Sequence, residues 1–211
     1  MALTQRVIDW QNRGRSVDFR GHRIHVFEQE GEGLPLVMLH GFPSSSYDWQ
    51  PLVDRLEGRR ILAFDFLGFG LSDKPRNHVY SLAWQADLAD ELVRRTFPNE
   101  PVVLLAHDMG TSVATELFAR DLERKLGFDI DGALLFNGSI VLAKASLTRS
   151  QKVLRSRFGG LAAKFSSERI FKREFGAIFS PDHPLSPDEA ADQWSLIGYT
   201  DGRALGHRLI H

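Results

Sequence analysis

Residues 102–117 limit the possible folds of this chain more than any other part of its sequence. They begin with the apolar run Val102, Val103, Leu104 and Leu105. Four apolar residues without polar alternation are typical of a strand that is buried on both faces. Beyond residue 112, apolar residues recur at helical spacing, so a helix is predicted there. The strand must turn into the helix within a few residues, which requires small residues on both sides of the turn.

Asp108 occupies this turn, with Ala106 two residues before it and Gly110 two residues after it. The spacing small-x-nucleophile-x-small is the pattern that presents a nucleophile between a strand and a helix. A carboxylate can act as that nucleophile, because it can attack carbon and form an ester. Aspartate is also a preferred N-cap residue. On this stretch alone both interpretations are open, a catalytic nucleophile or the cap of the following helix.

Composition narrows the class of protein. The chain has 211 residues, of which 43% are hydrophobic, and a formal net charge of -1. This predicts one domain, or one domain with a large insertion. The charge does not favour a nucleic acid or an anionic membrane as partner. Cysteine is absent, and residues 1–15 contain no leader-like apolar run. We therefore expect a cytoplasmic protein that acts on a small molecule, and its oligomeric state is left open.

The order of the predicted elements indicates an α/β fold. Strands are expected at 34–39, 61–66 and 131–136 in addition to 102–105, with a helix at 81–97, and such alternation is typical of a parallel sheet. Residues 16–29 predict an antiparallel edge pair that turns at Gly21. His22 and His25 lie three residues apart on one of these strands. Their side chains should point to opposite faces, so surface positions are expected rather than a metal site.

Two loops follow predicted strands. His40-Gly41-Phe42-Pro43 comes after the strand at 34–39, and Gly41 allows the backbone to approach a ligand closely. We expect the backbone N–H of Phe42 to face the site. The glycine-rich loop at 67–73 raises the alternative of a dinucleotide site. However, Lys74 and Pro75 stand where the helix of such a site should begin, which argues against it.

The pattern changes after Ser139. Apolar strand runs stop, and short helical patterns rich in Lys, Arg and Phe follow. We predict an α/β core over residues 1–139 and a helical cap over residues 140–211. The last helical pattern reaches His211 without a stop signal. The expectation is a chain that is truncated before the last core strands.

Three motifs in order resemble those of the α/β-hydrolase superfamily. They are the H-G-F-P loop, the D-x-L-G-F-G-L-S-D loop and the A-H-D-M-G turn. The H-D-x-G turn is similar to that of the branch with an aspartate nucleophile, which includes epoxide hydrolases, haloalkane dehalogenases and mesoderm-specific-transcript-like proteins. The stretches LLAHDMGTSVATELF, FNGSI and DGRALGHRLIH are most similar to the last group. The resemblance covers essentially the whole chain and implies the α/β-hydrolase fold with a helical cap.

The resemblance also implies a two-step reaction without cofactor or metal. Asp108 would attack an electrophilic carbon and form an alkyl-enzyme ester. The backbone N–H groups of Phe42 and Met109 would form the oxyanion hole for hydrolysis of this ester. In epoxide hydrolases cap tyrosines protonate the epoxide oxygen, and Tyr199 is the one such candidate here. Trp194 is a candidate for lining the cavity. Both aromatic residues have the alternative of simply packing the cap.

Several positions depart from the related families. Haloalkane dehalogenases usually have Trp where Met109 stands and often Asn where Phe42 stands. Some relatives place the catalytic acid in the slot that holds Asn137 here. His183, His207 and His211 lie in the predicted cap, so none is expected to be the catalytic base. His107 is expected to point away from Asp108.

The interpretation that follows is a hydrolase with Asp108 as its nucleophile, similar to epoxide hydrolases. A haloalkane dehalogenase-like enzyme is an alternative. An ester hydrolase is a further alternative, although that chemistry normally needs serine at position 108. The remaining alternative is a binding protein without catalytic activity that has kept the fold.

Overall fold

The computed structural model describes residues 1–138, 148–164 and 167–210. Its six described strands form one sheet in the order β1-β2-β4-β3-β5-β6. β3 pairs in parallel with β4 and β5, and β5 pairs in parallel with β6, whereas β2 is antiparallel to both β1 and β4. The mostly parallel α/β sheet predicted from the sequence is thereby confirmed. The strands are β1 (Arg15–Phe19), β2 (His22–Gln29), β3 (Glu32–Leu39), β4 (Arg59–Phe64), β5 (Val102–His107) and β6 (Ile130–Phe136).

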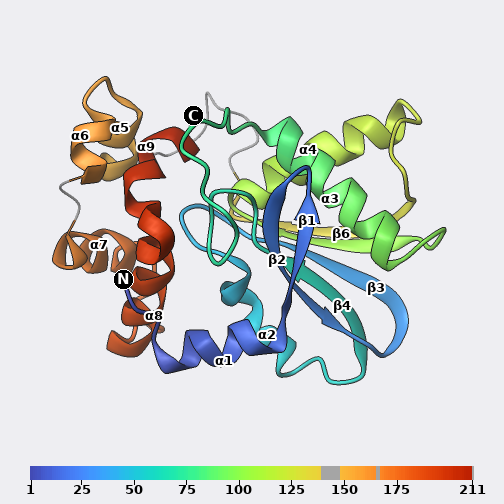
Figure 1. Ribbon diagram of the computed structural model, residues 1–211. Coiled ribbons are helices and arrows are strands. Elements are labelled where there is room, and N and C mark those ends of the chain that lie inside the picture. The colour runs from blue at the N-terminus through green and yellow to red at the C-terminus, as the bar shows by residue number, and fades with distance from the viewer. Residues whose placement is uncertain (139–147, 165–166, 211) are drawn as a thin grey trace.

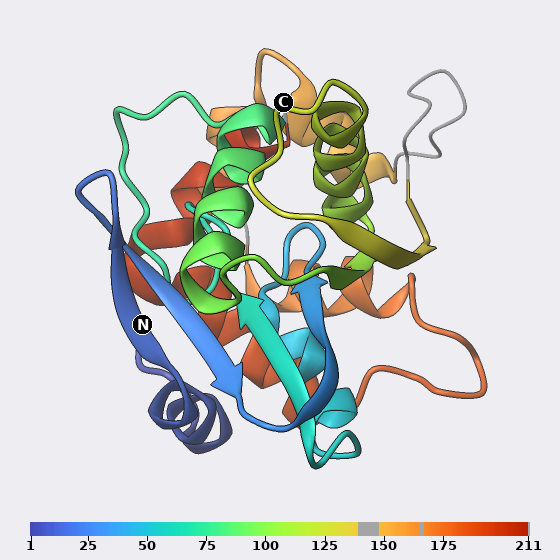
Figure 2. The ribbon, with the colours of Figure 1, turned by 90° about the vertical axis from the view of Figure 1, so that its right-hand side faces the viewer.

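Helices lie on both faces of the sheet and in a separate group beside it (Figures 1 and 2). The helices that precede the second gap in the description are α1 (Gln5–Arg13), η1 (Ser46–Trp49), α2 (Gln50–Val53), α3 (Leu82–Thr96), α4 (Met109–Leu122), α5 (Arg149–Arg155) and α6 (Gly159–Lys164). Those that follow it are α7 (Glu168–Gly176), α8 (Pro187–Gly198), η3 (Tyr199–Leu205) and α9 (Gly206–Leu209). Figure 1 shows α5 to α9 gathered together, with α1 running beneath α8.

Two buried clusters fill the two faces of the sheet. One joins the strands to α3 and α4 and includes Leu88, Leu104 and Leu117. The other joins the opposite face to α1, η1 and α2, with Trp10 and Trp49 among its members. Leu196 of α8 belongs to this second cluster, so α8 packs on the same face of the sheet as α1, η1 and α2. Burying both faces explains why the central strands consist of unbroken apolar runs.

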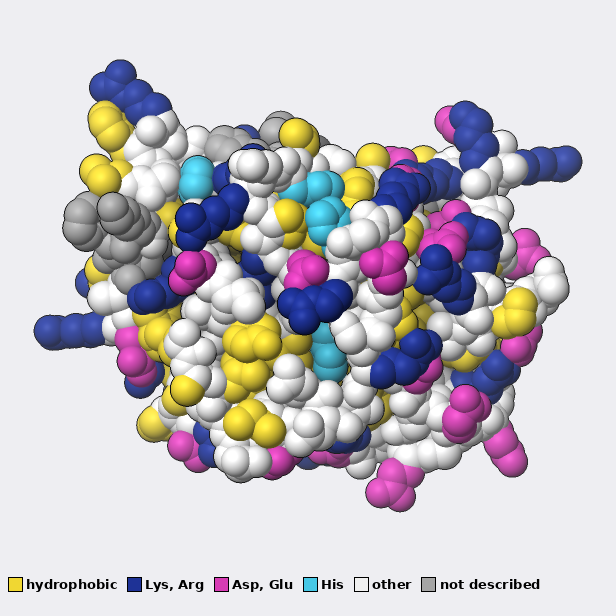
Figure 3. Space-filling view, viewed as in Figure 1, with side chains coloured by type: hydrophobic (Ala, Val, Ile, Leu, Met, Phe, Trp, Pro, Cys, Tyr) yellow, Lys and Arg dark blue, Asp and Glu magenta, His cyan; other side chains and the backbone are white. Residues whose placement is uncertain are grey.

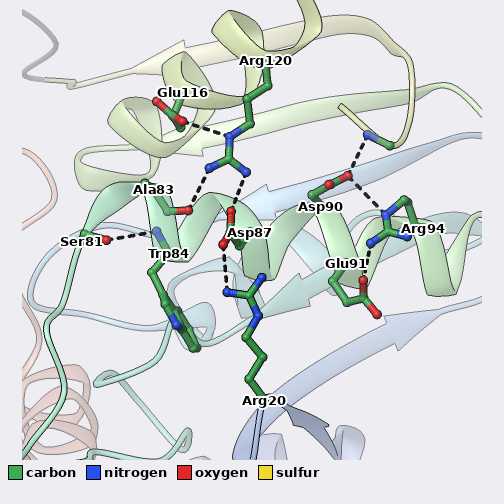
Figure 4. Close-up of polar contacts among 11 residues, drawn as sticks. Arg20, Ser81, Ala83, Trp84, Asp87, Asp90, Glu91, Arg94, Glu116 and Arg120 are labelled. Carbon is green, nitrogen blue, oxygen red and sulfur yellow. Dashed lines mark hydrogen bonds and ion pairs between the residues drawn. The ribbon is translucent and has the colours of Figure 1, made fainter. Parts of the chain in front are cut away.

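Ion pairs fasten α3 to α4 (Figure 4). Arg120 of α4 donates to the Asp87 carboxylate at 2.8 Å and to the Ala83 carbonyl at 3.0 Å, both on α3. Arg20, in the turn between β1 and β2, donates to the other Asp87 oxygen at 2.9 Å. Asp87 thus links the outer hairpin to both helices. This fixes the position of α4, whose first residue follows Asp108.

One edge of the described sheet is apolar and accessible. β6 pairs only with β5 among the described strands. Three of its consecutive side chains remain exposed, with exposed fractions of 62% for Leu134, 39% for Leu135 and 41% for Phe136. On the face shown in Figure 3, acidic and basic side chains are interspersed, in keeping with the net charge of -1.

Beyond residue 147 the described chain consists of short helices joined by turns and loops, and no strand occurs in residues 148–164 or 167–210. The boundary expected at Ser139 lies outside the described residues, so the division into core and cap stays a prediction. None of the described helices is long and apolar enough to cross a lipid bilayer.

The surface position expected for His25 is wrong. Its side chain is buried, with an exposed fraction of 6%. β2 lies between β1 and β4 and is therefore not an edge strand. His25 consequently lies in the interior, and burial lowers the pKa of its imidazole. Among the described residues no group of three or more His, Cys, Asp or Glu could hold a metal ion.

Candidate active site

Asp108 lies at the sharp turn between β5 and α4, as the sequence predicted. β5 ends at His107 and α4 begins at Met109, which leaves Asp108 as the only residue between them. Its φ of 49° and ψ of -117° lie outside the regions that most residues adopt. Asp108 is the N-cap residue of α4, but its side chain makes no capping hydrogen bond to that helix. A non-glycine residue held in such a conformation is often found at a functional site.

The space around the turn explains the small residues that flank Asp108. Ala106 is fully buried. A Cβ atom added to Gly110 would lie 2.3 Å from the Leu39 carbonyl oxygen and 2.8 Å from that of His40. Both contacts are with backbone, which cannot rotate away as a side chain can. The close approach of α4 to the end of β3 therefore depends on glycine at position 110.

The Phe42 amide contacts the Asp108 side chain directly. Its N–H donates a hydrogen bond of 2.8 Å to Asp108 Oδ1. A Cβ atom on Gly41 would lie 2.7 Å from Asp108 Cβ and 3.1 Å from Oδ1, so this approach also depends on glycine. The structure thereby brings together two of the three residues that the sequence singled out for attack and oxyanion binding.

Met109, the third of these residues, follows Asp108 and packs partly buried against the cluster on the α3 and α4 side. Within the described part of the chain, no hydrogen bond to the Met109 N–H is found. The convergence of the Phe42 and Met109 amides on one oxyanion stays a prediction.

His40 holds the loop that carries Phe42. The Phe66 N–H donates to His40 Nε2 at 3.0 Å, and His40 Nδ1 lies 2.8 Å from the Gly41 carbonyl oxygen. Because Nε2 accepts, Nδ1 must carry the proton and donate to Gly41. Burial lowers the pKa of His40, which keeps the ring neutral and this pair of bonds intact.

A second polar connection reaches the same loop from α8. Ser44 Oγ lies 3.3 Å from the Gly41 carbonyl oxygen and also forms a hydrogen bond with Asp48 Oδ2. Gln193 of α8 donates from Nε2 to Asp48 Oδ1 at 2.7 Å. Burial raises the pKa of Asp48 to about 6. Asp48 and Gln193 are 145 positions apart and carry no local motif, so neither could be predicted from the sequence.

Because folding raises the pKa of Asp48, the stability of the chain should depend on pH through this group. The pKa is 3.8 without burial and about 6 in the fold, so folding favours the protonated acid. The stabilisation is complete below about pH 3.8 and is lost as the pH rises through about 6. We expect wild type to lose up to about 3 kcal/mol relative to Asp48→Asn across this range. Urea unfolding of both proteins at several pH values measures the difference.

Asp54→Asn serves as the matched control, because Asp54 follows the same helical segment and its side chain is 42% exposed. Its unfolding free energy should run parallel to that of wild type. Parallel curves for wild type and Asp48→Asn would contradict the expectation.

An apolar groove of about 160 Å³ lies between the Phe42 loop and the C-terminal helices. Trp194, whose exposed fraction is 5%, and Phe42 both line this groove, and a substrate-binding role for Trp194 stays a prediction. Asp108 itself is not among the lining residues, so Phe42 is what connects it to the groove. The described lining consists of Phe42, Pro43, Thr148, Gln151, Leu154, Ala163, Ile170, Phe171, Glu174, Phe175, Ile178, Trp194, Ile197, Arg203 and Gly206.

Tyr199 is not brought to this groove. It follows α8, and its ring faces the Lys74 Nζ at 5.4 Å from the ring centroid. Burial lowers the pKa of Lys74 to about 8. The packing alternative therefore describes the position of Tyr199 in this structure, and its role as an acid stays a prediction.

No histidine of the described chain forms a hydrogen bond with Asp108. His107 Nε2 lies 3.5 Å from Asn137 Nδ2, and its ring packs against Phe136, as expected for a side chain turned away from Asp108. His183 is exposed. The Nδ1 atom of His207 is buried without a partner among the described residues, and His211 lies outside the described residues.

Comparison with known proteins identifies the family. Residues 35–133 match the family model of the alpha/beta hydrolase fold. LipZ of Mycobacterium tuberculosis is 49% identical over 204 residues, which cover 97% of this chain and 70% of LipZ. The chain belongs to the α/β-hydrolase family. The human mesoderm-specific transcript homolog protein is 36% identical over 219 residues, covering 99% of this chain and 65% of that protein. The predicted resemblance to this group is confirmed.

Solved structures of the family agree with this assignment. A variant of the haloalkane dehalogenase DatA from Agrobacterium tumefaciens C58 superposes with a TM-score of 0.73 at 25% identity, covering 93% of this chain and 67% of that one. The epoxide hydrolase CorEH has a TM-score of 0.75 at 22% identity, with 93% and 72% covered. At that identity the likeness to CorEH establishes the fold alone. Hydrolase chemistry is the common property of these neighbours.

Proposed function

We propose that Asp108 is a nucleophile that attacks an electrophilic alkyl carbon, that of an epoxide, and forms an alkyl ester. The observation that carries this proposal is the hydrogen bond between the Phe42 N–H and Asp108 Oδ1 at the strained turn. A residue that merely capped α4 would bond to its own helix instead. The family membership and the haloalkane dehalogenases among its relatives support the same chemistry.

In the first step, a carboxylate oxygen of Asp108 forms a bond to an epoxide carbon. The C–O bond of that carbon breaks, and its electron pair stays on the oxygen, which takes a proton from water. With a haloalkane, the halide leaves with the electron pair instead. A carboxylate attacks carbon directly, so this step needs no base. The apolar groove favours a substrate with an alkyl or aromatic body.

In the second step, water attacks the carbonyl carbon of the ester. The negative charge that develops on the carbonyl oxygen would be stabilised by the Phe42 N–H, with Met109 N–H as the proposed second donor. The attacking water must lose a proton, and help from a general base is typically worth about 10²–10⁴-fold. Among the described residues no histidine is bonded to Asp108, so we expect this 211-residue chain to stop at the ester.

Intact-mass spectrometry tests the proposal. The folded chain is incubated with terminal epoxides and with 1-haloalkanes of the same carbon skeleton. We expect one adduct per chain, with the whole epoxide mass added, or with the alkyl group added and hydrogen halide lost. Peptide mapping should place the adduct on Asp108. Asp108→Asn, which preserves the size of the side chain, should remain unlabelled.

Equal labelling of Asp108→Asn would overturn the assignment of the nucleophile. Steady turnover of many equivalents by the 211-residue chain would show that it does contain a base. A folded chain that forms no adduct but binds the alkyl compounds would favour the alternative of a non-catalytic binding protein.

A methyl group at position 41 should weaken the reaction without removing the nucleophile. In Gly41→Ala the new Cβ would lie 2.7 Å from Asp108 Cβ, so Asp108 must move away from the Phe42 N–H. We expect the rate of adduct formation to fall at least about tenfold, which corresponds to about 1.4 kcal/mol in the barrier. The measurement is the time course of the same mass shift.

Gly132→Ala is a control for the general effect of replacing a glycine, because a Cβ there meets nothing within 4 Å and no positive φ is required. Its rate should equal that of wild type. If Gly41→Ala also reacts at the wild-type rate, close contact between Gly41 and Asp108 is unnecessary for attack.

A further inference from the structure

The peptide group between Gly41 and Phe42 is held at both of its ends. Its N–H donates to Asp108 Oδ1 at 2.8 Å. Its carbonyl oxygen, on Gly41, lies 2.8 Å from His40 Nδ1 and 3.3 Å from Ser44 Oγ. Because a peptide group is planar, the groups that fix the carbonyl also fix the direction of the N–H. The hydrogen bonds to the Gly41 carbonyl therefore control the direction of the Phe42 N–H, which faces Asp108.

The Ser44 hydroxyl has two acceptors within reach but only one proton. One acceptor is the Gly41 carbonyl oxygen, and the other is Asp48 Oδ2. When Asp48 is ionised, it can only accept, so the Ser44 proton is drawn to the carboxylate. When Asp48 is protonated, it can donate to Ser44 Oγ, and the Ser44 proton is free to point at Gly41.

Gln193 determines where the proton on Asp48 is placed. Its Nε2 donates to Asp48 Oδ1 at 2.7 Å, which occupies that oxygen as an acceptor. A proton on Asp48 therefore belongs on Oδ2, the oxygen that faces Ser44. Since Gln193 lies on α8, the C-terminal helices take part in this arrangement.

We propose that Asp48 is a positioning residue for the Phe42 amide, and that its protonation state decides whether the Ser44 hydroxyl donates to the Gly41 carbonyl or to Asp48. In the acid form, the peptide carbonyl accepts from both His40 and Ser44. In the ionised form, it accepts from His40 alone. Adding a donor to the carbonyl polarises the peptide and strengthens its N–H as a donor. The inference rests on the proposed function only where it connects the Phe42 amide to chemistry at Asp108.

The surroundings of Asp48 place this change in an accessible pH range. The charged groups that face it are both acidic, namely Glu189 of α8 and Asp65 at the end of β4, and both raise its pKa. Ser44 and Gln193 contribute the hydrogen bonds, which lower the pKa, but burial outweighs them. Within the described residues no salt bridge reaches Asp48. The group therefore changes its charge at a higher pH than an exposed aspartate does.

Solution NMR of the full ¹³C,¹⁵N-labelled chain tests the proposal without any substrate. The observables are the Gly41 carbonyl carbon, the Phe42 amide proton and the Asp48 side-chain carboxyl carbon, followed from roughly pH 4.5 to 8. We expect all three signals to move together with one midpoint. The Phe42 amide proton should move downfield toward low pH, as its hydrogen bond to Asp108 strengthens.

Three variants separate the steps. Asp48→Asn should abolish the movement and hold the Gly41 and Phe42 signals at their low-pH positions, because an amide N–H replaces the acid O–H. Ser44→Ala should leave the Asp48 carboxyl titrating while the Gly41 carbonyl stays constant. Glu189→Gln should keep the coupled movement but lower its midpoint, because a neighbouring negative charge is removed.

Two results would overturn the proposal. One is a Gly41 carbonyl that stays constant while Asp48 titrates, which would place the proton on Oδ1 facing a reoriented Gln193 amide. The other is a Gly41 titration that persists in Ser44→Ala. Either can occur whether or not Asp108 becomes alkylated, so failure here is distinct from failure of the nucleophile assignment.

Discussion

Replacing Gly110 with alanine is expected to destabilise the fold by about 3 kcal/mol, at the upper end of what overpacking usually costs. The added Cβ would lie 2.3 Å from the Leu39 carbonyl oxygen and 2.7 Å from the Leu39 carbonyl carbon. Since both atoms are backbone, α4 must move away from β3 or the turn at Asp108 must open. Alanine has a better helix propensity than glycine, which recovers only about 1 kcal/mol. The expected loss of about 3 kcal/mol is what remains after this gain.

Urea unfolding measures the effect, and Gly132→Ala is its matched control. Gly132 lies in β6, where an added Cβ meets nothing within 4 Å. Its free energy of unfolding should stay within about 0.5 kcal/mol of wild type. If Gly110→Ala proved as stable as Gly132→Ala, the tight approach of α4 to β3 would not be a requirement of this fold.

Replacing Asp192 with alanine is expected to cost about 2–3 kcal/mol, because it removes an acceptor shared by three donors, of which the Tyr47 hydroxyl is buried. The Asp192 side chain is only 2% exposed. It accepts hydrogen bonds from Thr4 Oγ1 at 2.5 Å, from Arg6 Nε at 2.7 Å and from the Tyr47 hydroxyl at 2.9 Å. These donors come from α1, its cap and η1, so the change removes one of the polar links between those segments and α8.

Asp188→Ala provides the control for this second experiment. Asp188 also pairs with Arg6, at 3.2 Å, but its side chain is 80% exposed. Exposed ion pairs contribute little, so its unfolding free energy should change by less than about 1 kcal/mol. Similar losses in both variants would mean that the charge of Arg6 matters and the buried position of Asp192 does not.

The parts of the structure that could be predicted from sequence are those with local constraints. A run of buried strand residues, one central Asp and small residues two positions away define the turn at Asp108 without any knowledge of distant residues. The start of α8 is also set by local residues, because Pro187 is its first residue and the Ser186 side chain accepts from the Glu189 N–H. Local hydrogen-bonding preferences decide such features.

The parts that could not be predicted depend on residues far apart in the chain. Asp48 and Gln193 are ordinary polar residues in sequence, and only the packing of α8 against η1 makes them a partly buried hydrogen-bonded pair. α1 was likewise not predicted. It is fixed by Val7 and Trp10, which are buried against the sheet. His25 was misplaced for the same reason, because its environment follows from the strand order rather than from its neighbours in sequence.

The bonds between α1 and α8 join segments that are 186 positions apart. Such a link makes the two helices one cooperative unit in local unfolding, although they are never neighbours along the chain. Amide protons of α1 should therefore exchange with solvent together with those of α8, and fraying at Thr4 should release both. An affinity tag fused before residue 5, or proteolytic trimming of the first residues, would then alter the wall of the apolar groove that α8 provides through Trp194.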